Sequence, residues 1–197
     1  MAFVAFLDAC VLYKATLRDV LLSLAEKDVY QAKWSPDVLD EMARNLADRP
    51  GIDPSRARAG ANYARSTMER AFPDALVNPD AYGPLVAVVT NHANDRHVLA
   101  AAIAGRADVL VTANVRHFPV SACLPYNVDV QDPDTFLQHQ FGLNPELITM
   151  ILEELARERS SPPLTTVEGI LGSLKAENPN FVAMATQYLR LQKDAQA

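Results

Sequence analysis

Near its N-terminus the chain carries the apolar run Phe3-Val4-Ala5-Phe6-Leu7, and Asp8 follows it directly. A short, continuous apolar run that ends at a turn is typical of a strand buried within a parallel sheet. In open α/β sheets, ligands bind in the crevice outside the carboxyl ends of the strands. We therefore expect the Asp8 carboxylate to lie at the mouth of such a crevice.

Helical and strand-like periodicities alternate after Asp8, which predicts an α/β fold with a mainly parallel central sheet flanked by helices. Ser35-Pro36 and Asp53-Pro54 each combine a favoured N-cap residue with a proline suited to the first helical position. Gly105 marks a helix end. The expected strands span 3–7, 29–34 and 108–112, and the expected helices span 16–27, 35–50, 53–71 and 94–104.

Helix signals replace strand signals beyond residue 125. They occur at Pro133, at Asn144-Pro145, at Thr165 with Glu168 in the spacing of a capping box, and at Asn178-Pro179. We expect two domains, an α/β domain over 1–142 and a helical appendage over 143–197. The apolar faces of this appendage exceed what three short helices bury among themselves, so we expect it to dock partly on the α/β domain and to bind a protein partner.

The composition describes an ordinary protein of the cytoplasm. The chain has 197 residues and a formal net charge of −6, and no apolar stretch approaches the roughly 20 residues that span a bilayer. No basic leader precedes Phe3. Cys10 and Cys123 lie far apart, with no CxxC pair and no histidine at ligand spacing, so we expect two reduced thiols rather than a zinc site or a disulfide.

Four polar residues fall at the edges of the expected elements, namely Asp8, Glu41, Asp95 and Asn114. Carboxylates gathered in one crevice repel one another unless a cation lies between them. Mg²⁺ prefers oxygen ligands in octahedral geometry. Water bound to such an ion loses a proton more readily and then attacks a phosphodiester as the nucleophile. These residues therefore predict a metal-dependent hydrolytic site.

The distribution of basic residues favours a nucleic-acid substrate although the chain is acidic overall. Six arginines fall within 44–70, and Arg96, Arg116 and His117 lie beside the later carboxylates. Clustered basic side chains neutralise phosphates. For each residue alone, a surface charge or a partner of a helix terminus remains an equal alternative.

Four blocks of the sequence resemble the PIN-domain family. They span 6–13, 34–41, 94–102 and 111–119, in the family's order and at matching spacing. The resemblance covers roughly residues 3 to 140, and the segment that follows resembles the helical extension of one branch of VapC-type toxins. The resemblance implies a PIN-like three-layer fold.

By position, the resemblance makes Asp8, Glu41 and Asp95 the metal-binding carboxylates. Asn114 stands where the family often has a fourth acidic residue, and Cys10 stands where many members have asparagine. The amide of Asn114 carries no charge and would not hold a second cation well. Together with Cys10, this departure from the family favours one metal ion over two. Arg96, Arg116 and His117 are the candidates for contact with the substrate phosphates.

Thr112 matches a hydroxyl residue at the end of the last of these strands, where its implied role is a hydrogen bond to a carboxylate or to metal-bound water. A strand-end Asp with a later strand-end Thr also occurs in HAD-like phosphohydrolases. Those enzymes need a second acid two residues after the first, and this chain has Cys10 there. Another alternative is a PIN-like module that binds RNA or protein without metal.

The family further implies a Mg²⁺- or Mn²⁺-dependent endoribonuclease that serves as the toxin of a type II toxin–antitoxin pair. The implied partners are an RNA substrate, a cognate antitoxin protein and a second copy of the chain in a homodimer.

Overall fold

The computed structural model describes residues 3–159 and 165–196. The chain divides into two compact units. The sheet unit consists of the chain up to Lys14 together with Tyr30–Gln131, and the helical unit consists of Ala15–Val29 together with the chain from Asp132 onward. Each unit is described by itself below.

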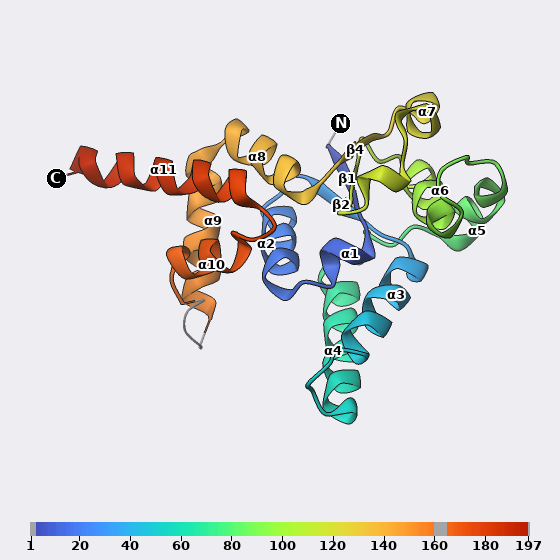
Figure 1. Cartoon of the computed structure of the whole chain (residues 1–197), viewed down its shortest axis with the longest axis horizontal. Coiled ribbons are helices and arrows are strands. Elements are labelled where there is room, and N and C mark those ends of the chain that lie inside the picture. The colour runs from blue at the N-terminus through green and yellow to red at the C-terminus, as the bar shows by residue number, and fades with distance from the viewer. Residues whose placement is uncertain (1–2, 160–164, 197) are drawn as a thin grey trace. The chain divides into compact units, whose positions relative to one another are not determined.

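A parallel sheet forms the centre of the sheet unit (Figure 1). In the described residues it contains four strands in the order β2-β1-β3-β4. Their bounds are β1 Val4–Leu7, β2 Gln31–Lys33, β3 Val109–Val111 and β4 Asp129–Gln131. All three strand pairs are parallel, so the carboxyl ends of the strands lie along one edge of the sheet.

The two central strands are the most apolar. In β1, Ala5, Phe6 and Leu7 are fully buried, and every residue of β3 is buried. Strands buried on both faces are typical of parallel sheets covered by helices. The expected α/β class, with a mainly parallel sheet flanked by helices and further helices toward the C-terminus, is therefore confirmed.

Local signals explain where the longer helices of the sheet unit begin. Ser35 caps α3 by accepting a hydrogen bond from the backbone N–H of Val38, and Asp53 caps α4 in the same way with Ser55 and Arg56. The helices of this unit are α1 Ala9–Leu12, α3 Pro36–Ala47, α4 Pro54–Ala71, α5 Pro79–Tyr82, α6 Arg96–Ala104 and α7 Val120–Cys123. Short 3₁₀ segments are η1 Gly83–Ala87, η2 Ala93–Asp95, η3 Val115–His117 and η4 Leu124–Tyr126.

The helix α6 packs closely within the sheet unit because its buried face is made of small side chains. Ala100, Ala101 and Ala102 are fully buried. Gly105 ends the helix as expected, and its backbone lies so near Val77 that a Cβ at this position would come within 2.9 Å of the valine Cγ2. A larger residue at 105 would therefore displace Val77 or the end of α6.

The helical unit contains α2 Ala15–Glu26, α8 Pro133–Leu143, α9 Pro145–Glu158, α10 Val167–Leu174 and α11 Pro179–Gln196 (Figure 1). Asn144 caps α9 through the backbone N–H of Leu147. The cap of α10 is Thr166, which accepts from the backbone N–H of Gly169, so the expected capping box at Thr165 is wrong by one residue.

The helix α2 connects β1 to β2 in the chain, and such a helix is usually expected to cover the sheet. It packs against α9 and α10 and so belongs to the helical unit. Its buried face contains Leu17, Val20, Leu21 and Leu24. Asp19 of α2 pairs with Arg159, the residue after α9, and Lys27, the residue after α2, pairs with Glu154 of α9.

The apolar faces of the appendage therefore find partners that the sequence analysis did not count. Ile148, Ile151 and Leu152 of α9 are buried, as are Ile170 of α10 and Phe181 of α11. The helices α2 and α8 supply part of the surface that covers them. The boundaries between the compact units thus lie at either end of the segment Ala15–Val29 and after Gln131. The domain boundary at residue 142 stays a prediction.

Asp134 of α8 links two segments of the helical unit. It is buried, and its carboxylate accepts hydrogen bonds from the backbone N–H groups of Phe181 and Asn180, at 2.8 and 3.2 Å. These N–H groups lie in the first turn of α11, where a negative charge is favourable. None of the described helices is both long enough and apolar enough to cross a membrane.

Candidate metal centre

Asp8 and Thr112 are neighbours at the carboxyl edge of the sheet. Leu7 of β1 is paired with Val111 of β3, and the backbone N–H of Asp8 donates to the carbonyl oxygen of Val111 at 3.1 Å. The next residue on each strand therefore leaves the sheet at the same point. The strand-end position predicted for Asp8 is confirmed, and Thr112 meets it there.

Three donors hold the Asp8 carboxylate in one orientation. The Thr112 hydroxyl donates to Oδ2 at 2.6 Å, the Cys10 thiol donates to the same oxygen at 3.2 Å, and the backbone N–H of Ala9 donates to Oδ1 at 2.7 Å. Only 3% of Asp8 is exposed. A buried carboxylate fixed in this way is preorganised to accept a further positive partner.

Cys10 acts here as a neutral hydrogen-bond donor. Burial raises the pKa of its thiol to about 12, and the nearby charge of Asp8 contributes to the shift. The backbone N–H of Ala113 in turn donates to the sulfur at 3.2 Å. Cys10 and Cys123 are both free thiols, as expected.

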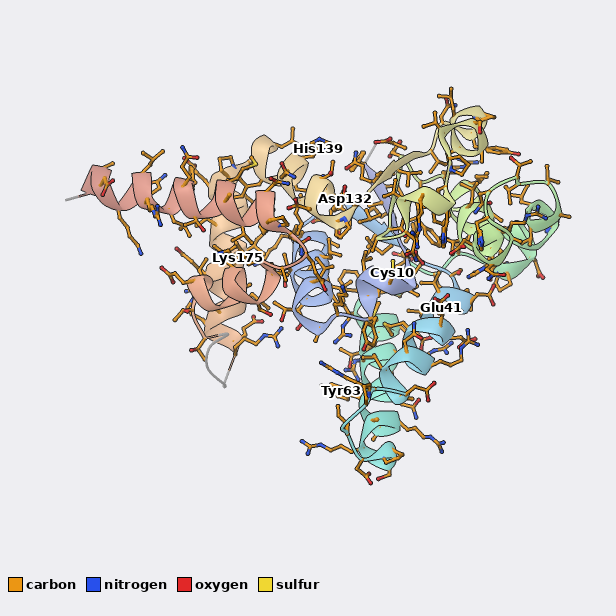
Figure 2. The ribbon with its side chains drawn as sticks, viewed as in Figure 1. Cys10, Glu41, Tyr63, Asp132, His139 and Lys175 are labelled. Carbon is orange, nitrogen blue, oxygen red and sulfur yellow. The ribbon has the colours of Figure 1, made fainter. Side chains whose placement is uncertain are left out.

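Glu41 lies in the second turn of α3 (Figure 2). Burial raises its pKa, and the negative charges of Asp8 and Asp95 raise it further, while His97 and Arg44 act in the opposite direction. The Nε2 atom of His97 lies 3.9 Å from Glu41 Oε2. The carboxylates of Asp8, Glu41 and Asp95, which come from three separate segments, thus repel one another.

Asp95 precedes α6 as its N-cap residue, but its side chain makes no capping hydrogen bond. Its Oδ2 atom lies instead 2.9 Å from Nδ1 of His92 and 3.1 Å from Nδ1 of His117. The interpretation of Asp95 as a simple helix-start charge therefore does not describe its contacts. Its carboxylate is directed toward a pair of imidazole rings.

The two histidines form a stacked pair. Their ring centroids are 4.4 Å apart and the rings are inclined by 18°. One ring nitrogen each of His92 and His117 and a carboxylate oxygen of Asp95 all lie within 4.8 Å of one another. Across residues 3–159 and 165–196, no such group of three includes Asp8 or Glu41. The expected carboxylates are therefore electrostatic neighbours of Asp95 rather than members of this tighter cluster.

The remaining predicted residues lie around the same end of β3. Asn114 precedes η3, is half-buried, and donates its backbone N–H to the Thr112 hydroxyl oxygen at 3.0 Å. Arg116 of η3 is exposed. Arg96 begins α6 and is half-buried, and its Nε atom is buried without a hydrogen-bond partner among the described residues.

The residues fit a divalent cation by their chemistry. Asp8, Glu41 and Asp95 offer carboxylate oxygens, which are the ligands that Mg²⁺ and Mn²⁺ take up in proteins. The mutual repulsion that raises the pKa of Glu41 is the repulsion that a cation would relieve.

Comparison with known proteins places this arrangement in a family. The family model described as "PIN domain" matches residues 4–116. The chain belongs to the PIN-domain family. Residues 133–187 match a second model, described as "VapC50 C-terminal domain". The chain is thus a VapC-type PIN domain with a C-terminal extension, as the sequence resemblance implied.

The curated relative that this PIN-domain chain matches is described as "Putative ribonuclease VapC50" from Mycobacterium tuberculosis (strain ATCC 25618 / H37Rv). The two are 38% identical over 122 residues, which cover 61% of this chain and 72% of the relative. No solved structure gave a significant match.

His92, which contacts Asp95 and His117, is not among the residues that the sequence singles out. Its signals were a histidine three residues before Asp95 and a second histidine, His117, just after the predicted strand. Its contact with His117 depends on a backbone hydrogen bond from the N–H of His92 to the carbonyl oxygen of His117, at 3.0 Å. Sequence spacing alone does not reveal such a pairing between distant loops.

Proposed function

We propose that this chain is a divalent-metal-dependent endoribonuclease that hydrolyses RNA phosphodiester bonds with Mg²⁺ or Mn²⁺. The observation that carries the proposal is the buried Asp8 carboxylate at the carboxyl edge of the sheet, fixed by Thr112, Cys10 and Ala9. Burial raises the pKa of Glu41, and the charges of Asp8 and Asp95 raise it further, which supports a cluster of the three carboxylates. A cluster of like charges lowers the stability of the metal-free protein, so its presence favours a role in cation binding.

Asp8, Glu41 and Asp95 are the proposed metal ligands. A divalent ion, when bound, acidifies a water molecule and neutralises the charge that develops on the phosphate oxygens. Thr112, Cys10 and the backbone N–H of Ala9 orient the Asp8 carboxylate. Glu41 ligates in its ionised form, and the nearby His97 side chain favours that form.

The proposed substrate contacts are Arg96, which begins α6, and Asn114 and Arg116, which lie between β3 and α7. Arg116 is exposed and Arg96 is half-buried, and their guanidinium groups suit phosphate oxygens. Asn114 lies next to Thr112 and orients water or substrate through its amide. His117 is also proposed as a phosphate contact, and its Nδ1 atom lies 3.1 Å from Asp95 Oδ2.

The biological role proposed is that of the toxin in a type II toxin–antitoxin pair. The support is the match to a "VapC50 C-terminal domain" and the similarity to a protein described as "Putative ribonuclease VapC50". The proposed partners are an RNA substrate, an antitoxin protein and a second copy of the chain. We further propose that the helical segment from 143 onward binds the protein partner and supplies no catalytic group.

The test uses the purified full chain and a fluorescently labelled single-stranded RNA library. Internal cleavage is expected with Mg²⁺ or Mn²⁺, none with EDTA, and recovery after metal is added back. Thermal unfolding without RNA separates the non-catalytic alternative, because a ligand that binds only the folded state raises the melting temperature. A chain that binds RNA equally with and without metal, shows no metal-dependent stabilisation and never cleaves would establish a binding module instead.

A further inference from the structure

We propose that His92, Asp95 and His117 bind a divalent transition-metal ion through the two Nδ1 atoms and the Asp95 Oδ2 atom. This site is separate in its donor chemistry from the carboxylate site proposed for Mg²⁺, although Asp95 is common to both. It does not rest on the nuclease proposal, since it depends only on the geometry of three side chains.

The distances between the donor atoms match the edges of a coordination polyhedron. Asp95 Oδ2 lies 2.9 Å from Nδ1 of His92 and 3.1 Å from Nδ1 of His117. Adjacent ligands of an octahedral ion with bonds of about 2.05 Å are about 2.9 Å apart, and those of a tetrahedral ion are about 3.3 Å apart. The two observed spacings fall within this range. Because the stacked rings are inclined by only 18°, both imidazoles must rotate before each Nδ1 lone pair points at one ion.

Backbone contacts hold the three ligands before any ion arrives. His92 donates its N–H to the carbonyl oxygen of His117 at 3.0 Å, and Asp95 donates its N–H to the carbonyl oxygen of His92 at 2.9 Å. The side-chain amide of Asn91, a residue only 3% exposed, donates to the carbonyl oxygen of Asp95 at 3.0 Å. These bonds fix the backbone of the three ligands, so only their side-chain torsions lose freedom when an ion binds.

The donor set selects the class of ion. Two imidazole nitrogens with one carboxylate oxygen suit Zn²⁺, Co²⁺, Ni²⁺ and Fe²⁺, whereas Mg²⁺ prefers a full set of oxygen ligands. Two histidines and one carboxylate leave further coordination positions for water or substrate. The side chain of His92 is 48% exposed and that of His117 is 27% exposed, so an ion can reach the cluster from solvent.

The competing interpretation is a purely hydrogen-bonded cluster, in which both rings donate Nδ1–H to a single carboxylate oxygen. In that case the stacked histidines orient Asp95 and bind no metal. The two interpretations differ in where the Nδ1 protons are. Metal binding displaces both protons, and the hydrogen-bonded cluster retains them.

The experiment titrates the metal-free full chain with Co²⁺ and Zn²⁺, following Co²⁺ absorbance and the heat of Zn²⁺ binding. The variants are His92→Gln and His117→Gln, with His139→Gln, in the helical unit, as the matched control. Changing a residue that only supports a metal ligand costs about 10–100-fold in affinity, so losing a ligand is expected to weaken Zn²⁺ binding at least tenfold. The control is expected to bind as the unaltered chain does.

Two further measurements keep the outcome decisive. Pulsed electron paramagnetic resonance of Co²⁺ bound to the unaltered chain is expected to detect imidazole ¹⁴N coupling, which needs no variant and which an all-carboxylate site would lack. Asp8→Asn is expected to retain Zn²⁺ binding even if nuclease activity is lost, so failure of the nuclease proposal leaves this result intact. Absence of nitrogen coupling, or unchanged Zn²⁺ affinity in both histidine variants, would overturn the inference.

Discussion

Thr112 donates its hydroxyl hydrogen to Asp8 Oδ2 across 2.6 Å, although 104 positions separate the two residues in the chain. The pairing of β1 with β3 brings them together, because each follows its strand directly at the point where Leu7 and Val111 are in register. The Thr112 oxygen also accepts the backbone N–H of Asn114 at 3.0 Å. One hydroxyl thus fixes both the Asp8 carboxylate and the loop that carries Asn114.

Thr112→Val is expected to destabilise the protein and to lower metal-dependent RNA cleavage, because Asp8 Oδ2 loses its shortest hydrogen bond and the N–H of Asn114 loses its acceptor. A hydrogen bond to a charged group contributes about 1.5–3 kcal/mol to stability. Urea unfolding and cleavage rates measure the two effects. Thr112→Ser keeps the hydroxyl and is the matched control; a Thr112→Val protein as stable and as active as the unaltered chain would show that the hydrogen bond contributes nothing.

The metal-free protein is expected to lose stability as the pH rises above the ordinary Glu41 pKa of 4.5. Burial and the charges of Asp8 and Asp95 raise the folded-state pKa of Glu41, so its contribution to stability is fully present below 4.5 and is lost as the pH rises through the raised value. Thermal unfolding between pH 4 and 8 in EDTA measures the loss, and Mg²⁺ is expected to reduce it.

Glu41→Gln should flatten that part of the pH profile. Asp40→Asn is the matched control, because Asp40 is the exposed neighbour on α3 and pairs with Arg65. If the Glu41→Gln profile keeps the slope of the unaltered chain, the repulsion does not involve Glu41.

Asn114→Asp is expected to tighten Mn²⁺ binding, because it adds a negative charge beside the Thr112 and Asp8 pair. A unit charge about 4 Å from a divalent ion contributes about 2 kcal/mol even in bulk water, which corresponds to roughly 30-fold in affinity. Titration calorimetry measures the change, and Asn62→Asp, at an exposed position of α4, serves as the control for added charge. No gain in an intact Asn114→Asp protein would mean that this side chain faces away from the metal ligands.

Ending the chain at Gly142 is expected to abolish cooperative folding of α2, although the sequence analysis placed a domain boundary there. The helices α9 and α10, which pack on α2, would be missing. Leu17, Leu21 and Leu24 would then be exposed, and burying each such side chain is worth about 1.5–3 kcal/mol. Urea unfolding checks this; a midpoint equal to that of the full chain would show that α2 needs no helical partner.

The parts of the fold and site that sequence predicts are those with local causes. The strand β1 ends where the apolar run is followed by Asp8. Ser35 and Asp53 cap helices through their side-chain oxygens, and each directly precedes a proline. The strand before Thr112 was recognised for the same reason as β1. Each of these signals depends on a few adjacent residues.

The parts that sequence does not predict depend on pairing between distant segments. The strand β4 consists of Asp129, Val130 and Gln131, and none of them is fully buried. Only one of the three is apolar, so the sequence shows no apolar run there. The apolar face of α2 suits a sheet or a helix equally, and only the packing shows its helical partners. The contact of His92 with His117 follows from loop geometry rather than from spacing.

The most direct test of the account is the rate of RNA cleavage by Asp8→Asn and Asp95→Asn at saturating Mg²⁺, with Asp40→Asn as the matched control. Each of the first two changes removes a charge from the proposed cation site while preserving shape. Both are expected to abolish cleavage while remaining folded by circular dichroism, and Asp40→Asn is expected to cleave as the unaltered chain does. Cleavage at the unaltered rate by folded Asp8→Asn or Asp95→Asn would contradict the assignment of these carboxylates to a catalytic metal site.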